Sequence, residues 1–148
     1  MSIGLVISSE YEQIKNANAA LTVLLKGTGL FKTVLRGFPE DINVYSGPTV
    51  TSYITGADFK DTMGVQNKPE YLNTLIGVIV KGTKTEAHDK TLEASLALLS
   101  NFREQDNWKT LEGNVRNTSI TNFNIYPEKS KKGLLTTAIL QLKHHIYK

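Results

Sequence analysis

The segment that most constrains the fold is Tyr71–Lys81, whose centre, Leu75–Val80, is the longest apolar stretch in the chain. Apart from Gly77, both sets of alternate positions in this centre are apolar. That pattern is typical of a strand in the middle of a sheet that is buried on both faces. The stretch is also far shorter than the ~18 apolar residues that indicate a membrane-spanning helix. The segment therefore predicts a central strand covered on both faces and no membrane span.

Helical periodicity marks two other segments. Apolar residues recur at helical spacing from Ser9 to Lys26, and Gly27 provides a stop because glycine readily adopts the left-handed conformation that ends helices. A second helix is expected over Glu86–Glu104, just before Trp108, which is expected to anchor the core rather than bind a ligand. The expected buried stripe of this second helix consists of Leu92, Leu96, Leu99 and Phe102.

Further strands are expected around these helices. Leu30–Arg36 and Thr49–Thr55 are rich in strand-forming residues, and Gly56 is expected to end the second of them. Ile42–Tyr45 is a candidate for a short extended piece. The tail predicts a long β-hairpin, with strands at Val115–Tyr126 and Leu134–Tyr147 and a turn at Pro127–Gly133.

The segment Ala57–Pro69 is polar and weakly periodic, and we expect a long loop, with one helical turn around Phe59–Met63 as an option. Ordered loops of this length are uncommon in compact domains and are often functional. A functional loop and a plain surface excursion both remain open at this point.

Together these elements predict one α+β domain over residues 1–148. Its sheet should be mixed but mainly antiparallel, flanked by two main helices and ending in the long β-hairpin. A chain of 148 residues buries roughly 70% of its unfolded surface, which is enough for a core without disulfide or metal staples.

No residue pattern for catalysis or metal binding is found. The chain has no Cys, which excludes disulfides, thiolate metal sites and cysteine nucleophiles. His144 and His145 are adjacent in an expected strand and so point to opposite faces, where they cannot easily share a metal. His144 falls on the apolar side and is expected to be a hydrogen-bonded, partly buried residue. We expect no catalytic residue, no metal and no cofactor.

Basic residues crowd the expected hairpin turn at Lys129, Lys131 and Lys132. A flexible basic turn can touch nucleic-acid phosphates. Lysines also keep strand edges soluble and unpaired, so both interpretations stay open. The net charge of +3 permits contact with DNA without indicating it.

The order of the elements suggests one family. A capped N-terminal helix is followed by a β-region with the turn Gly47-Pro48, then by the strand Tyr-Leu-Asn-Thr-Leu-Ile-Gly-Val-Ile-Val. Next come a helix containing Leu-Ala-Leu-Leu-Ser-Asn-Phe and a tail of Ile-Thr-Asn-Phe-Asn-Ile-Tyr, a polar turn and Leu-Thr-Thr-Ala-Ile-Leu-Gln-Leu-Lys-His-His-Ile-Tyr. In length and element order the chain resembles the tail terminator, or tail completion, proteins of long-tailed bacteriophages, including the minor tail protein U-like group. The resemblance covers most of the chain and rests on no diagnostic residue motif.

The resemblance implies a structural protein without enzymatic activity or cofactor. It implies a homo-oligomeric ring, usually a hexamer, that caps the tail tube, ends its polymerisation and offers a surface for head attachment. The implied partners are other copies of the chain, the tail tube protein and a head–tail connector or neck protein, with DNA passing through the channel. The implied location is the neck end of the virion tail. Because Met1–Ile7 lacks signal-peptide features, we expect a soluble protein made in the host cytoplasm.

Two groups of residues are expected to make the contacts that such a ring requires. Aromatic residues beside a turn make good anchors, which favours Tyr45, Pro48 and Tyr53 as an interface between subunits. The expected loop adds Asp58, Phe59 and Met63 as contacts to a neighbour or to the tube. By the same resemblance, the lysines of the hairpin turn would lie on the DNA path.

Three alternatives remain. The chain resembles other phage neck or tail-tube subunits less closely, because tube subunits are dominated by β-barrel structure and this chain has two good helices. A small nucleic-acid-binding domain would use the basic hairpin. A small hydrolase or ligand-binding enzyme is disfavoured by the missing motifs.

Overall fold

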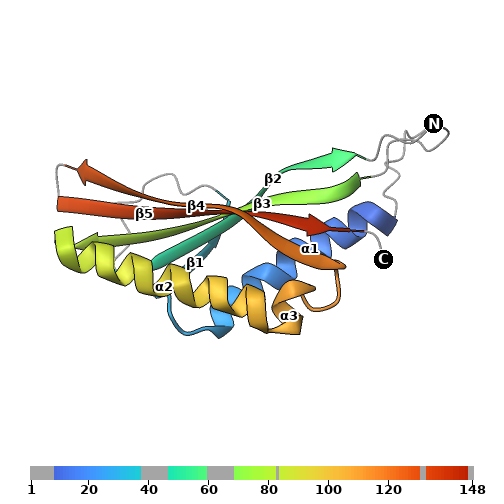
Figure 1. Ribbon diagram of the computed structural model, residues 1–148, viewed down its shortest axis with the longest axis horizontal. Helices are drawn as coiled ribbons and strands as arrows, with labels where there is room; N and C mark the ends of the chain where they lie inside the picture. Colours follow the sequence, from blue (N-terminus) through green and yellow to red (C-terminus); the bar gives the residue numbers. More distant parts are fainter. Residues whose placement is uncertain (1–8, 38–46, 60–68, 83, 131–132, 147–148) are drawn as a thin grey trace, which may run out of the picture.

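The computed structural model describes residues 9–37, 47–59, 69–82, 84–130 and 133–146 (Figure 1). All described strands belong to one five-stranded sheet with the order β1-β2-β3-β5-β4. β1 and β2 are parallel, and every other neighbouring pair is antiparallel, which confirms the predicted fold class. The elements are α1 (Ser9–Gly27), β1 (Thr33–Arg36), β2 (Thr49–Phe59), β3 (Pro69–Gly82), α2 (Lys84–Glu104), α3 (Asp106–Lys109), β4 (Asn117–Ser130) and β5 (Gly133–His145).

The two long helices lie on the same side of the sheet (Figure 1). α1 packs beneath β1 and β2, and α2 packs beneath β3, β5 and β4. The core between helices and sheet is built from alternate positions of the strands, as in Leu72, Ile76 and Val78 of β3. Leu21 and Leu25 complete it from α1, as the helical periodicity predicted.

β3 is the middle strand of the sheet, as the apolar run predicted. The expectation that it is covered on both faces holds only for its second half. There Ile79 is 6% exposed, and Gly77 lies so close to Thr51 of β2 that a Cβ would come within 3.2 Å of the threonine methyl. In the first half, Tyr71 and Leu75 are only half-buried on the side away from the helices.

The expected buried stripe of α2 is wrong by about one residue. Leu96 is 49% exposed and Leu99 half-buried, whereas Leu98 is fully buried. The buried face includes Thr91 and Ser95, whose hydroxyls donate to the carbonyls of the preceding turn at 2.7 Å each. Because these hydroxyls are satisfied within the helix, polar residues occupy core positions and the apolar pattern alone misplaces the face. Of the other two residues in the predicted stripe, Phe102 is fully buried, as expected, and Leu92 is half-buried.

β2 runs past Gly56, where it was expected to end, and continues to Phe59. A register shift between Ile54 and Gly56 leaves Thr55 as the extra residue of a β-bulge, which lets the strand continue. The expected loop Ala57–Pro69 is therefore wrong at both ends, because Pro69 opens β3, and Phe59 is not helical. Residues 60–68 and the expected extended piece at 42–45 lie outside the described residues.

The hairpin also extends beyond its expected strands. β4 continues through Pro127 to Ser130, and β5 begins at Gly133, so most of the expected turn is strand. Pro127 is tolerated because β4 is an edge strand, where a missing N–H on the outer side disturbs no ladder. Trp108 is buried against Phe102 with its ring edge-on at 5.0 Å, which confirms its expected place in the core.

The buried imidazole of His144 connects three strands. Its Nδ1 lies 2.8 Å from the Thr118 hydroxyl and its Nε2 3.0 Å from the Thr74 hydroxyl. The Thr118 hydroxyl donates to the Lys109 carbonyl at 2.8 Å, so it accepts from a proton on Nδ1, and Nε2 accepts from Thr74. Burial lowers the pKa of His144 to about 4, so the ring is neutral at pH 7. The expected hydrogen-bonded histidine is confirmed, and its burial is complete rather than partial.

Candidate functional site

The side of the sheet opposite the helices, here called the open face, carries no described helix (Figure 1). At the end where β2 finishes and β3 begins, its side chains are half-buried or exposed. They are mostly hydroxyl, amide and aromatic groups, with few charges. The accessible members of the open face include Tyr53, Thr55, Asp58, Tyr71, Asn73, Leu75, Asn117, Ser119, Thr121, Ile139, Gln141, Lys143 and His145.

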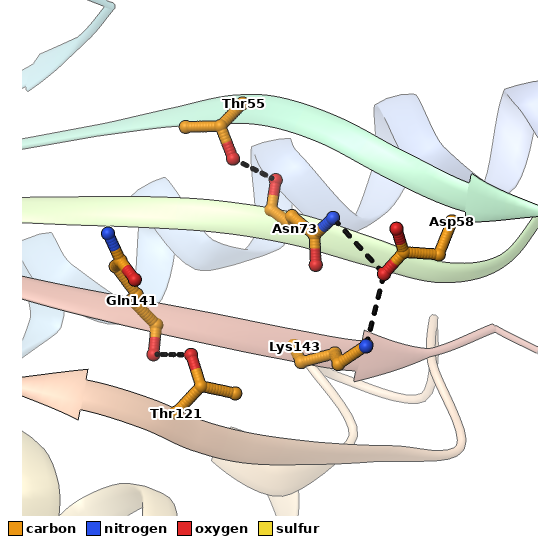
Figure 2. A network of polar contacts seen from close by, with 6 residues as sticks. All are labelled: Thr55, Asp58, Asn73, Thr121, Gln141 and Lys143. Carbon is orange, nitrogen blue, oxygen red and sulfur yellow. Dashed lines mark hydrogen bonds and ion pairs between the residues drawn. The ribbon is translucent and has the colours of Figure 1, made fainter.

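A polar network links three strands across this face, as Figure 2 shows. Lys143 of β5 forms an ion pair with Asp58 of β2, with 3.1 Å between Nζ and Oδ2. Between them lies β3, from which the Asn73 side-chain amide donates to the same carboxylate oxygen at 3.4 Å. The Thr55 hydroxyl donates to the Asn73 carbonyl at 3.2 Å. The Lys143 and Asn73 donors hold the pKa of the Asp58 carboxyl below its usual range.

Two aromatic rings extend this network along the sheet. Tyr71 and His145 stack at 5.0 Å with an interplanar angle of 26°. The ammonium of Lys143 also lies 4.6 Å from the centre of the Tyr71 ring, a cation–π contact. The ammonium of Lys143 therefore contacts both the Asp58 carboxylate and the Tyr71 ring. This part of the open face presents hydrogen-bonding and stacking groups with little net charge.

A second surface lies on the other side of the sheet, where α2 meets β4. A groove of about 560 Å³ is lined by Leu96, Leu99, Ser100, Phe102, Arg103, Thr118 and Ile120. Two of its apolar side chains are substantially exposed, Leu96 at 49% and Ile120 at 36%. Sequence patterns miss this groove because the helical spacing of apolar residues places Leu96 in the core.

The sheet edges form the third feature. β4 is an edge strand over its full length, and its run from Asn117 to Tyr126 carries no charged residue. On the opposite side, β1 pairs only with the Thr49–Ser52 part of β2. From Ile54 to Phe59, no described strand lies on the outer side of β2. Unpaired strand edges offer backbone donors and acceptors to another chain.

The structure separates the predicted contact residues into two places. Asp58 and Phe59 lie together at the end of β2, and Asp58 joins the network. Pro48 is half-buried just before the other end of β2, some ten residues away, which corresponds to roughly 33 Å of strand. Tyr53 lies between them, half-buried, and burial raises the pKa of its hydroxyl.

The remaining predicted residues are Tyr45, Met63, Lys131 and Lys132, which lie outside the described part of the chain. Lys129 belongs to the end of β4, and its side chain is likewise outside the description. Sequence patterns do not identify the network partners Asn73, Tyr71 and Lys143. Period-two alternation does put all three on one side of their strands, but it does not say which strands become neighbours.

Within the described residues, no group of three or more His, Asp or Glu side chains is placed to hold a metal ion. None of the described helices is long and apolar enough to cross a membrane.

Comparison with known proteins gives little. No protein-family model and no curated protein matches the chain. Among solved structures, the chain is similar to one described as the structure of bacteriophage SPP1 gp17 protein. The two share 13% identical residues over 95% of this chain and 92% of that chain, with a TM-score of 0.39. A likeness this distant does not assign the chain to a family.

Proposed function

We propose that the chain is a structural protein of a tailed bacteriophage that caps the end of the tail tube as a ring of identical copies. The cap stops tube polymerisation and offers a surface to which the head attaches. The resemblance in length and element order implies that the ring is a hexamer. The protein acts without catalysis or cofactor, is made in the host cytoplasm and ends at the neck end of the virion tail.

The observation that carries the proposal is the pair of unlike open edges on one sheet. One edge is the long, uncharged part of β4, and the other is the end of β2 beyond β1. Contacts between two different patches of the same chain are heterologous, and heterologous contacts generate closed rings when the rotation between copies closes. A sheet with two unlike edges is suited to that kind of assembly.

The surface left for the tube follows from this arrangement. If the edges meet neighbouring copies and the helices cover one face, the open face is free for another partner. Its hydroxyl, amide and aromatic groups resemble the polar, Tyr-containing surfaces of protein–protein interfaces. We assign the tail tube protein to the open face and the neck or connector protein to a part of the ring that the tube leaves free, with DNA passing through the channel.

The test is a tube-growth assay. Purified protein is added to growing tail tubes of the same phage, and tube lengths are measured by electron microscopy. Amounts far below one copy per tube subunit should shorten the final lengths, because only tube ends are targets. Unchanged lengths at a molar excess of the protein would contradict the proposal.

A matched pair of variants locates the contact. Gln141→Arg places a large cation on the exposed centre of the open face, next to the network (Figure 2). Gln105→Arg makes the same change at an exposed site after α2. The first should raise the concentration needed for capping about tenfold or more, and the second should leave it unchanged. Equal effects of the two variants on the capping concentration would show that the tube does not contact the open face.

A further inference from the structure

We infer that the sheet continues from one copy of the chain into the next, with the outer edge of β2 over Ile54–Phe59 lying against the edge of β4 over Asn117–Thr121. This contact deepens the proposed ring, on which it rests, by naming the two surfaces that meet. The partner is a second copy of this chain, and each copy uses both edges.

The receiving edge is short and well defined. Asn117, Ser119 and Thr121 are exposed along it. A register shift between Ile120 and Asn122 then interrupts the strand, and the Asn122 side chain accepts a hydrogen bond from the Phe123 N–H at 2.9 Å. Because that bond satisfies the N–H beyond the bulge, a new ladder would end near Thr121.

The directions of the strands suit this pairing. β2 is antiparallel to β3, β3 to β5, and β5 to β4, so β2 and β4 run in opposite directions. A second copy rotated about an axis along the strands keeps its helices on the same side. Its β2 then approaches the first copy's β4 in antiparallel orientation, the commoner and slightly more stable arrangement of paired strands.

The two segments also lie at the same level of the sheet. Tyr71 of β3 pairs with both Asp58 and His145, and His145 pairs with Asn117. A rotation without a large shift therefore brings the end of β2 opposite the first residues of β4. At the other end of the sheet β1 covers β2, so among the described strands the outer side of β2 is open only at this end.

Side chains on the two edges fit each other. Phe59 is 53% exposed at the end of β2, one residue beyond Asp58 of the open-face network. A register irregularity between Asp58 and Phe59 interrupts the regular alternation of the strand there, and we infer that the Phe59 ring turns toward the helix side. On that side, the groove with Leu96, Leu99 and Ile120 lies beneath β4. An exposed aromatic ring on one edge thus meets an exposed apolar groove on the other.

Charges are complementary as well. Asp58 is the sole charge on β2. Arg116 is exposed immediately before β4, and Arg103 lines the groove. Arg116 therefore lies near the position that the acidic end of β2 would reach, whereas Arg103 lies on the helix side and is paired with Glu104 at 3.2 Å.

The contact is small, with a ladder of about five residues and one inserted ring. Stable interfaces bury about 1,200–2,000 Å² in total, and this contact alone falls short of that size. We therefore expect weak association of free copies, which becomes stable when the ring closes on a tube end.

The absence of cysteine from the chain permits a clean trapping experiment. One variant carries Thr55→Cys and another Ser119→Cys, and the two are mixed at high concentration under oxidising conditions. Neighbours in an antiparallel ladder have Cα atoms about 4.5–5.5 Å apart, a distance that disulfides can span. The mixed dimer should form in large excess over either homodimer. Asp89→Cys on the exposed side of α2 serves as the control and should give no dimer with Thr55→Cys.

The groove gives a second measurement. Adding Leu96→Asp or Ile120→Asp to the Ser119→Cys variant should reduce trapping at least tenfold, whereas Val23→Asp, at a side chain 64% exposed on α1, should not. Circular dichroism establishes that each variant is folded. Dominant homodimers, or no dimers in folded and concentrated protein, would overturn the inference.

This outcome is separable from that of the proposed function. If a Leu96→Asp, Ile120→Asp double variant caps tubes normally, the capping role stands and the edge contact is refuted. Specific trapping by a protein that leaves tube lengths unchanged would support the edge contact and refute the capping role.

Discussion

The imidazole of His144 shows how a titratable group can belong to a core. Its two ring nitrogens are matched by the Thr74 and Thr118 hydroxyls, and it is fully buried. Because burial lowers its pKa from 6.5 to about 4, protons bind more tightly to the unfolded chain. The neutral ring therefore favours the fold above pH 6.5, and this contribution is lost as the pH falls toward 4.

The first prediction follows from this linkage. Between pH 7 and pH 4 the free energy of unfolding should fall by roughly 3 kcal/mol more in the wild type than in His144→Leu. Urea unfolding followed across this range measures both curves, and their difference isolates the histidine from the carboxylates. Val23→Ala, at a side chain 64% exposed on α1, is the control for substitution itself and should follow the wild type. Parallel curves for wild type and His144→Leu would show that the ring does not titrate as described.

The ion pair on the open face gives a second prediction at the residue scale. Lys143→Met removes the ammonium that lies 3.1 Å from the Asp58 carboxylate while keeping an unbranched side chain. The pKa of Asp58, now held low by its donors, should rise. Carboxyl NMR chemical shifts followed against pH report it directly. Lys90→Met on α2 is the matched control, and an unchanged Asp58 titration in Lys143→Met would mean that the pair does not form in solution.

At the scale of elements, α2 shows which leucines hold the fold. Leu98 is fully buried, whereas Leu96, two residues earlier, is 49% exposed. Leu98→Ala should lower the free energy of unfolding by ~2–5 kcal/mol, the usual cost of a core truncation. Leu96→Ala should change it by no more than about 0.5 kcal/mol, as exposed positions usually do. Urea unfolding of the two variants tests the orientation of the helix, and equal costs would mean that the helix is rotated from the described position.

Those two leucines also show how far sequence patterns reach. The apolar run predicted β3 as the central strand, and the alternation in the tail predicted the hairpin. Both predictions succeeded because the apolar residues of these segments follow the positions that a strand buries. The orientation of α2 was missed because Thr91 and Ser95 satisfy their hydroxyls within the helix and so occupy the core. Strand ends were missed because the bulge at Thr55 and the edge position of Pro127 let strands pass residues that usually end them.

The candidate site was only partly predictable for a different reason. Asp58 and Phe59 were proposed as contacts from their place in an expected loop, and they lie instead at the end of β2. Their neighbour Lys143 is distant in sequence and comes close only through the strand order β2-β3-β5. Local alternation fixes the face of a side chain, whereas strand order depends on the whole sheet.

At the scale of the whole molecule, the described helices and strands leave one face and two unlike edges of the sheet available. The edges differ in length, charge and side-chain shape, which favours contacts between unlike patches over symmetric dimers. The open face lies between the edges and carries the Asp58–Lys143 network. Edge contacts that close a ring and a face that meets a tube are therefore compatible within one subunit.

The central claim is that this subunit recognises the end of a tail tube. The most direct measurement images gold-labelled protein on assembled tubes of the same phage by electron microscopy. The account predicts label at one tip of each tube, with the walls bare and no tight binding of the protein to duplex DNA at physiological salt. Label along the tube walls, or tight binding to duplex DNA in place of the tip, would contradict it.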